Sequence, residues 1–148
     1  PPQPPEYLIF GGIVFVPLSE PYLRSEWGDL FEERAPISLI EPWIRNVRQF
    51  PGEEIVVLSC VFASPLTAGL THLMNRRLLR CDGEPVQNLR HLAQLLDEGS
   101  RPSVLFELDE EDVVALPRLQ AHSVTAQVLT ANLVPAARRL LPPNAEKL

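Results

Sequence analysis

The chain has 148 residues, 45% of them hydrophobic and 22% charged, which fits a single soluble globular domain with one core. Its net charge of −6 and its dispersed basic residues argue against nucleic-acid binding. The longest apolar run, residues 55–63, is too short to span a membrane and fits a buried strand.

The chain opens with a proline-rich stretch, PPQPP, followed by two short apolar segments. We expect residues 1–6 to form an extended linker from an upstream region, so that any targeting peptide would lie before this sequence. Residues 7–10 are predicted to be a strand or a loop, and residues 13–16 a second short strand. Gly11 and Gly12 between them lack a Cβ and leave the backbone free to turn.

Residues 19–50 are predicted to be a helical insertion. Ser19 can N-cap a first helix, and Pro21 is tolerated in the first turn of that helix. A second helix is predicted over residues 38–47. Apolar side chains recur at helical spacing in both, and we expect both tryptophans to be core residues. These apolar positions are Leu23, Trp27, Leu30 and Phe31 in the first helix, and Ile40, Trp43, Ile44 and Val47 in the second.

The middle of the chain continues with β-branched segments. Residues 54–62 are predicted to be a strand, because Val and Ile dominate them. Residues 65–70 are predicted to be a short helix that ends at a glycine. Residues 77–80 are predicted to be another strand, closed by the turn dipeptide Asp82-Gly83.

The last part of the chain predicts two helices and two strands. Asn88 is a good N-cap for a leucine-rich helix, which Gly99 would end. The elements expected after it are strands at 104–108 and 113–116, joined by an acidic turn, a helix over 119–131, and a polar tail over 135–148. This mixed order with short turns between strands predicts the α+β class and an antiparallel sheet.

The sequence contains no pattern of catalytic or metal-binding residues. A serine hydrolase needs a nucleophile, a base and an orienting acid, and neither a GxSxG elbow nor a GDSGG-like serine is present. The histidines are His72, His91 and His122. His91 lies in a leucine-rich helical segment, and the other two show no serine or carboxylate context that suggests a triad. We therefore predict no catalytic residues, no metal and no cofactor. Cys60 and Cys81 are expected to be small buried hydrophobes, and the acidic run 109–112 to be solvated.

A binding surface remains as the functional hypothesis. A glycine-containing loop that leads into a strand can aim several N–H groups at a carboxylate, and a free strand edge can pair with an extended peptide. The residues predicted for these roles are the loop 10–13, the strand 13–16 and the helix 88–96.

The run 53–98 resembles the PDZ domains of Deg/HtrA serine proteases. The motifs that match are Asp82-Gly83-Glu84-Pro85-Val86 and Leu89-Arg90-His91-Leu92. The segments YLIFGGIVFVPLSEPYL, GEEIVVLS and VVAL, together with the insertion and the C-terminal helix, are similar to the second PDZ domain of plant Deg proteases. The resemblance implies a PDZ-like, partly open antiparallel β-barrel capped by helices over residues 7–134.

The resemblance also implies a peptide groove. Its carboxylate-binding loop falls on Phe10, Gly11, Gly12 and Ile13, its peptide-pairing strand on Val14, Phe15 and Val16, and its helix positions on Asn88, Leu92 and Leu95 or Leu96. Gly11 stands where the family's loop usually carries a hydrophobic residue. We expect at least two of the three leucines to be core residues.

The function implied by the resemblance is that of a non-catalytic PDZ module of an ATP-independent serine endopeptidase. Its expected partner is another PDZ domain or an internal segment of a homo-oligomeric parent, in the chloroplast, with the nucleus or the mitochondrion as alternatives. One alternative function is a receptor for C-terminal peptides, which needs an open groove beside residues 13–16. Another is a small enzyme with a pocket under the insertion, with His91 and the acidic turn as its candidate residues.

Overall fold

The computed structural model describes residues 4–45 and 48–142 and confirms the α+β class. The described strands form one antiparallel sheet in the order β7-β6-β4-β3-β2-β1-β8, with β5 paired to β4, and the sheet does not close on itself. The strands are β1 (Tyr7–Phe10), β2 (Ile13–Pro17), β3 (Val56–Val61), β4 (Arg76–Cys81), β5 (Glu84–Pro85), β6 (Ser103–Leu108), β7 (Val113–Pro117) and β8 (Arg138–Arg139).

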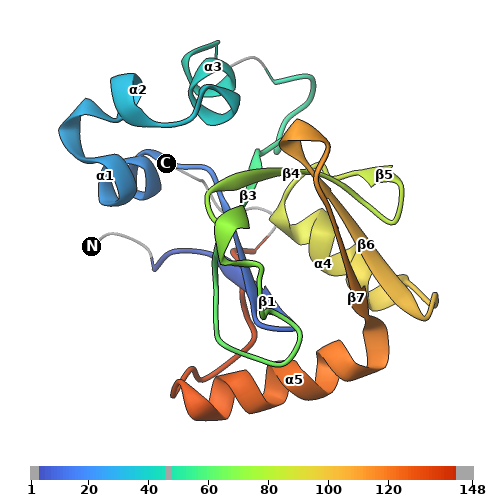
Figure 1. The fold of residues 1–148 in the computed structure, drawn as a ribbon. Coiled ribbons are helices and arrows are strands. Elements are labelled where there is room, and N and C mark those ends of the chain that lie inside the picture. The colour runs from blue at the N-terminus through green and yellow to red at the C-terminus, as the bar shows by residue number, and fades with distance from the viewer. Residues whose placement is uncertain (1–3, 46–47, 143–148) are drawn as a thin grey trace.

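Helices cover both faces of this sheet (Figure 1). The α-helices are α1 (Glu20–Trp27), α2 (Phe31–Arg34), α3 (Ile37–Arg45), α4 (Leu89–Glu98) and α5 (Arg118–Ala131), and 3-10 turns lie at Gly28–Leu30, Thr71–Leu73 and Asp109–Glu111. The main core lies between the sheet and α4, with Phe15, Phe106 and Leu92 fully buried. A second core joins β1 and β2 to α5 through residues such as Val14 and Val124.

The insertion folds as a layer of short helices, α1 to α3, beside the sheet (Figure 1). The Tyr22 N–H donates to Ser19 Oγ at 3.2 Å, which confirms the predicted N-cap. The two tryptophans, predicted as core residues, are half-buried and pack against a small core of Leu23, Phe31 and Ile40.

Some positions in the insertion depart from the helical pattern. Leu30 is 49% exposed, because Gly28 ends α1 and places Leu30 in a 3-10 turn. Ile44 is 61% exposed, because α3 buries only the face that carries Leu39 and Ile40. The predicted apolar position Val47 lies outside the described residues.

Turn and cap predictions in the middle of the chain are confirmed. Asp82 and Gly83 have φ values of +51° and +84° and connect β4 to β5 as a two-residue turn. Asn88 Oδ1 accepts a hydrogen bond from the His91 N–H at 2.7 Å and caps α4. Gly99 ends α4 with an extended backbone, and its missing Cβ leaves room for the Arg118 guanidinium, 2.5 Å from where that Cβ would be.

Two local predictions are wrong. Residues 65–70 form turns instead of a helix, because Thr67 Oγ1 donates to Phe62 O at 2.6 Å and Ser64 Oγ accepts from the Leu66 N–H at 3.2 Å. Such side-chain bonds compete with helical backbone bonds. The acidic run is not uniformly solvated, since Asp109 is buried and forms an ion pair with Arg76.

The segment after α5 returns to the sheet, which the sequence did not predict. β8 pairs with β1, and the Ile9 N–H donates to Ala137 O at 2.7 Å. Glu6, in the stretch predicted as a linker, is buried and accepts from the Leu141 N–H at 2.8 Å. The outer edge of β1 is therefore covered by the chain's own C-terminal segment.

Both cysteines are free thiols in the structure. Cys81 is fully buried, and burial raises the pKa of its thiol to about 12, as expected for a small core residue. Cys60 is half-buried, and burial raises the pKa of its thiol as well. Within the described residues, no helix combines the length and the apolar character needed to cross a bilayer.

Candidate peptide-binding site

The strand predicted to pair with a peptide, β2, has a strand on each side. β1 pairs with it through Leu8↔Phe15 and Ile9↔Val14, and β3 pairs with its other edge, for example through Val16↔Val57. Both rows of main-chain groups on β2 therefore lie against neighbouring strands. An incoming peptide on the side of the glycine loop would have to displace β1.

The strand β1 reaches this position because the glycine pair makes a tight turn. Gly11 and Gly12 have φ values of +62° and +95°, a region that glycine adopts without steric cost. The turn sends β1 back along β2, so that Phe10 pairs with Ile13. The chain thus places its own strand at the edge where the sequence analysis expected a peptide.

The glycine loop is itself buried, and several of its main-chain groups are bonded within the chain. The Gly11 N–H donates to Thr125 Oγ1 of α5 at 2.8 Å, and Gly12 O accepts from the Phe62 N–H at 2.7 Å. A Cβ on Gly11 would lie 2.8 Å from Leu116 Cδ1. The Gly11 amide, which a carboxylate would need, is therefore already engaged by a threonine hydroxyl.

The helix predicted to line the groove faces the main core. Leu92 and Leu96 of α4 are 0% and 1% exposed, and they belong to the same cluster as Leu8 and Phe15. This confirms that at least two of the three leucines are core residues. Leu95 is half-buried at the margin of that cluster. The structure brings the predicted loop, strand and helix together, and β1, which is paired to the edge of β2, packs in the same core cluster as α4.

Both polar groups of the Asn88 side-chain amide form hydrogen bonds within the domain. Its Oδ1 caps the helix, and its Nδ2 donates to Gly52 O at 3.1 Å. The opposite face of the hairpin is closed by α5, where Val14 is buried and Val16 is half-buried. Both faces of the predicted groove strand are thus packed inside the domain.

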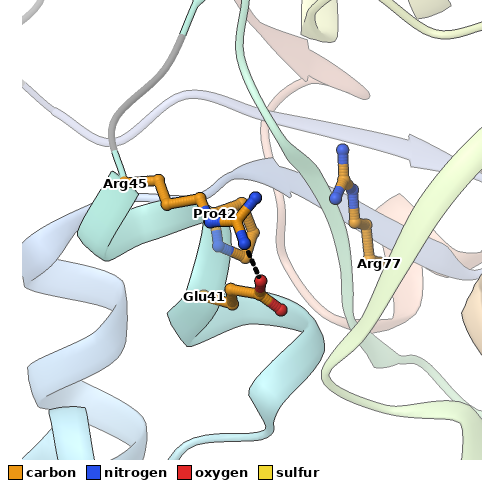
Figure 2. A pocket seen from close by; sticks show the side chains of 4 residues that line it. All are labelled: Glu41, Pro42, Arg45 and Arg77. Atoms are coloured by element: carbon orange, nitrogen blue, oxygen red, sulfur yellow. Dashed lines mark ion pairs between the residues drawn. The ribbon is translucent and has the colours of Figure 1, made fainter.

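Two surface clefts lie elsewhere, on the insertion. Figure 2 shows the first, between α3 and β4, where Glu41 forms an ion pair with Arg45 at 2.6 Å and Arg77 lies on the opposite wall. Its volume is about 310 Å³. The second, of about 500 Å³, is lined by Glu32, Trp43, Ile44 and Arg48. None of the predicted groove residues lines either cleft.

His91 and the acidic turn, the candidates for an enzyme, are both engaged in contacts within the domain. His91 Nδ1 accepts from the Gln87 N–H at 3.0 Å, and its Nε2 lies 3.7 Å from the Glu84 carboxylate. His72 and His122 are exposed. The acidic turn is occupied by Arg76, which also pairs with Asp112 at 2.8 Å. In the described residues, no group of His, Cys, Asp and Glu side chains could hold a metal ion.

Comparison with known proteins agrees with this arrangement of strands and helices. The family model described as "PDZ domain" matches residues 2–139. The chain belongs to the PDZ domain family. This PDZ domain is 33% identical over 134 residues to "Protease Do-like 2, chloroplastic" of Arabidopsis thaliana, covering 90% of this chain and 21% of the relative.

Two further Arabidopsis thaliana relatives show the same relationship. "Putative protease Do-like 3, mitochondrial" is 28% identical over 88% of the PDZ domain chain and 22% of its own length. "Protease Do-like 4, mitochondrial" is 29% identical over 90% of the chain and 23% of its own length. The chain therefore spans about a fifth of these curated relatives, and it is a PDZ domain related to those of Deg/Do-like proteases.

Sequence reasoning missed the residues that close the groove. The contact between Gly11 and Thr125 joins positions 114 residues apart, and nothing in either local sequence indicates it. Coverage of β1 by β8 depends on Arg138 and Arg139, which read as part of a polar tail. A local signal did exist for β1 itself, since an apolar segment before a Gly-Gly pair is typical of a hairpin arm.

Proposed function

We propose that this chain is a non-catalytic PDZ module of a Deg/Do-like serine endopeptidase, and that it mediates protein–protein contacts in assembly and regulation of that protease. The proposed partner is another PDZ domain of the same protease. The family membership and the Do-like relatives support the parent's identity. In this proposal the catalytic triad belongs to a part of the parent upstream of these residues.

The single observation that carries the choice of partner is the pairing of β2 on both edges. A PDZ domain that captures a free C terminus adds the peptide as a strand and binds its carboxylate through loop amides. Here β1 occupies that strand position, and the Gly11 amide bonds to Thr125. This favours a folded partner that meets the outer surface of the domain over a C-terminal peptide threaded into a groove.

The test is a parallel titration of this chain with two kinds of ligand. One is a library of fluorescent peptides, each in free-carboxylate and amidated form, and the other is the remainder of the parent protease. We expect saturable binding to the protease and no difference between free and amidated peptides. Micromolar peptide binding that is lost on amidation would overturn the proposal and establish a C-terminal peptide receptor.

We also propose that the parent works in an organelle, with the chloroplast favoured. The names of the relatives support an organellar location, because one is chloroplastic and others are mitochondrial. Imaging of the full-length precursor fused at its C terminus to a fluorescent protein tests it. Signal confined to mitochondria would correct the compartment, and nuclear signal would overturn the organellar assignment.

A further inference from the structure

The strand β7 forms the end of the sheet opposite to β8, and its outer edge is bare in the described part of the chain. Figure 1 shows β7 running from the acidic turn to the start of α5, beside β6. Such an edge presents unpaired main-chain groups to any extended partner. Proteins usually protect such edges with charged side chains, bulges or coverage by another segment. The segment 113–116 contains no charged residue, and only Pro117 interrupts the strand.

The hydrogen bonds between β7 and β6 identify the β7 residues whose N–H and C=O groups point outward. The Arg118 N–H donates to Pro102 O and the Leu108 N–H donates to Asp112 O, both at 2.8 Å. Because inward and outward residues alternate along an antiparallel strand, Val113 and Ala115 direct their N–H and C=O groups away from β6. In the part of the chain that the structure describes, these four groups meet no partner.

Apolar side chains surround this edge. Val113 is 54% exposed, Leu105 on the neighbouring strand is 36% exposed, and Leu119 just after β7 is 84% exposed. Val114 and Leu116 point into the core and hold the strand in place. The edge therefore combines unpaired main-chain groups with a rim of exposed hydrophobic side chains on a rigid strand.

We propose that β7 pairs antiparallel with β7 of a second copy of this chain. In a two-fold arrangement centred on Val114, Val113 of each copy faces Ala115 of the other, and the two residues exchange their outward N–H and C=O groups. This pairing rests on the proposed function, because it takes from it the idea that the chain mediates protein–protein contacts. It names a surface and a partner, a second copy, that the proposed function does not.

The charges at the two ends of β7 favour this orientation. Glu110 and Glu111 are exposed at the start of the strand, and Arg101 is exposed beside its end. Antiparallel pairing brings the acidic start of one copy to the basic end of the other. Within residues 4–45 and 48–142, neither Glu111 nor Arg101 has an ion-pair partner, so both are available for this contact. A parallel arrangement would place like charges together.

The experiment measures self-association of the chain by sedimentation equilibrium, with Ala115→Pro and Ala115→Lys as edge variants. Ala115→Pro removes an outward N–H without removing a bond to β6, and Ala115→Lys places a charge on the edge. Ala126→Lys is the matched control, because Ala126 is an exposed alanine on α5. We expect each Ala115 variant to weaken the dimer at least about tenfold, and the control to leave it unchanged. Circular dichroism verifies that each variant is folded.

A charge exchange tests the orientation. Glu111→Lys and Arg101→Glu should each weaken the dimer, and the double variant should restore it, because the ion pair is re-formed with its signs reversed. A chain that stays monomeric up to about 1 mM, or Ala115 variants that dimerise as well as the wild type, would overturn the inference. Capture of an unrelated extended peptide at β7 in place of a second copy would also overturn it. Binding of the remaining protease to a monomeric chain would leave the proposed function standing, so the two failures are distinguishable.

Discussion

The β1 end and the β7 end of the sheet differ in what covers the main chain of the outer strands. At one end, β1 is bonded to β2 on its inner side and to β8 and Ala137 on its outer side. At the other end, β7 is bonded to β6 alone within the described residues. The chain's own C-terminal segment therefore covers the edge of β1, whereas the outer edge of β7 has no covering segment among the described residues. The bare edge is the one at which we propose contact with a second copy of the chain.

We expect the largest loss of stability when Arg118, which holds the β7 end of the sheet against α4, is substituted. The buried Arg118 side chain donates to Leu96 O at 3.0 Å, to Arg101 O at 2.8 Å and to Asp82 Oδ2 at 3.1 Å. Arg118→Met leaves these acceptors without their donor, and we expect the free energy of unfolding to fall by about 3–5 kcal/mol. Urea unfolding measures this loss.

The matched control is Arg24→Met. Arg24 is 48% exposed and pairs with Glu20 and Asp29 at the surface, so we expect a loss below about 1 kcal/mol. Equal losses in the two variants would show that Arg118 does not anchor the β7 end.

The glycine turn at the β1 end provides the second test. Gly12→Ala places a Cβ 3.0 Å from Ser64 Oγ and 3.1 Å from Phe62 O, at a φ of +95°. Gly69→Ala is the control, since its φ is +81° and nothing lies within 4 Å of its Cβ. Both variants pay a conformational cost of roughly 1–2 kcal/mol. We expect Gly12→Ala to lose about 1–3 kcal/mol more than the control, by thermal or urea unfolding, because of overpacking.

The difference in stability between the two variants measures how tightly the β1–β2 hairpin is packed at its glycine turn. If Gly12→Ala and Gly69→Ala have the same stability, the loop has room to adjust, and β1 is held less firmly than its contacts imply. A peptide could then compete with β1 more easily.

The smallest expected effect concerns the ion pair between α4 and β8. Arg138 donates to Asp97 at 2.8 and 2.7 Å, and these bonds lower the pKa of Asp97 below its ordinary value of 3.8. Because the folded-state pKa is the lower one, the stabilisation is present above pH 3.8 and is lost as the pH falls below it. Both side chains are partly exposed, so we expect Asp97→Asn to cost less than about 1 kcal/mol at neutral pH.

Urea unfolding of the wild type and of Asp97→Asn from pH 7 down to about pH 3 measures this contribution. The difference between the two proteins should shrink as the pH falls. A difference that is constant with pH would mean that the aspartate charge does not stabilise β8.

Local sequence signals predicted most of the elements. The β-branched run of β3, the Asp82-Gly83 turn and the caps at Ser19 and Asn88 lie where the sequence placed them, because each depends on a few adjacent residues. The prediction of a short helix at 65–70 was wrong, and the cause is again a few adjacent residues. Ser64 and Thr67 bond to nearby backbone groups, which helical propensity alone does not include.

The candidate site shows where local reasoning stops. The sequence correctly grouped the glycine loop, β2 and α4, and it anticipated that two of the three leucines of α4 would be core residues. It did not reveal that β1 would occupy the edge of β2, because a strand's own sequence does not indicate which neighbouring edge it will pair with. The engagement of Gly11 by Thr125 was equally hidden, since α5 follows the loop by more than a hundred residues.

The sequence by itself determined the composition class, most of the strands and helices in their order, the Asp82-Gly83 turn, the caps at Ser19 and Asn88, and the resemblance to a PDZ domain. These features follow from propensity and periodicity over short windows. The tertiary structure decided which strand edges are paired and which are bare, whether Asp109 and Glu6 are buried, and where β8 returns to the sheet. Those outcomes depend on contacts between segments that are far apart in the sequence, and a short window of sequence does not contain both partners of such a contact.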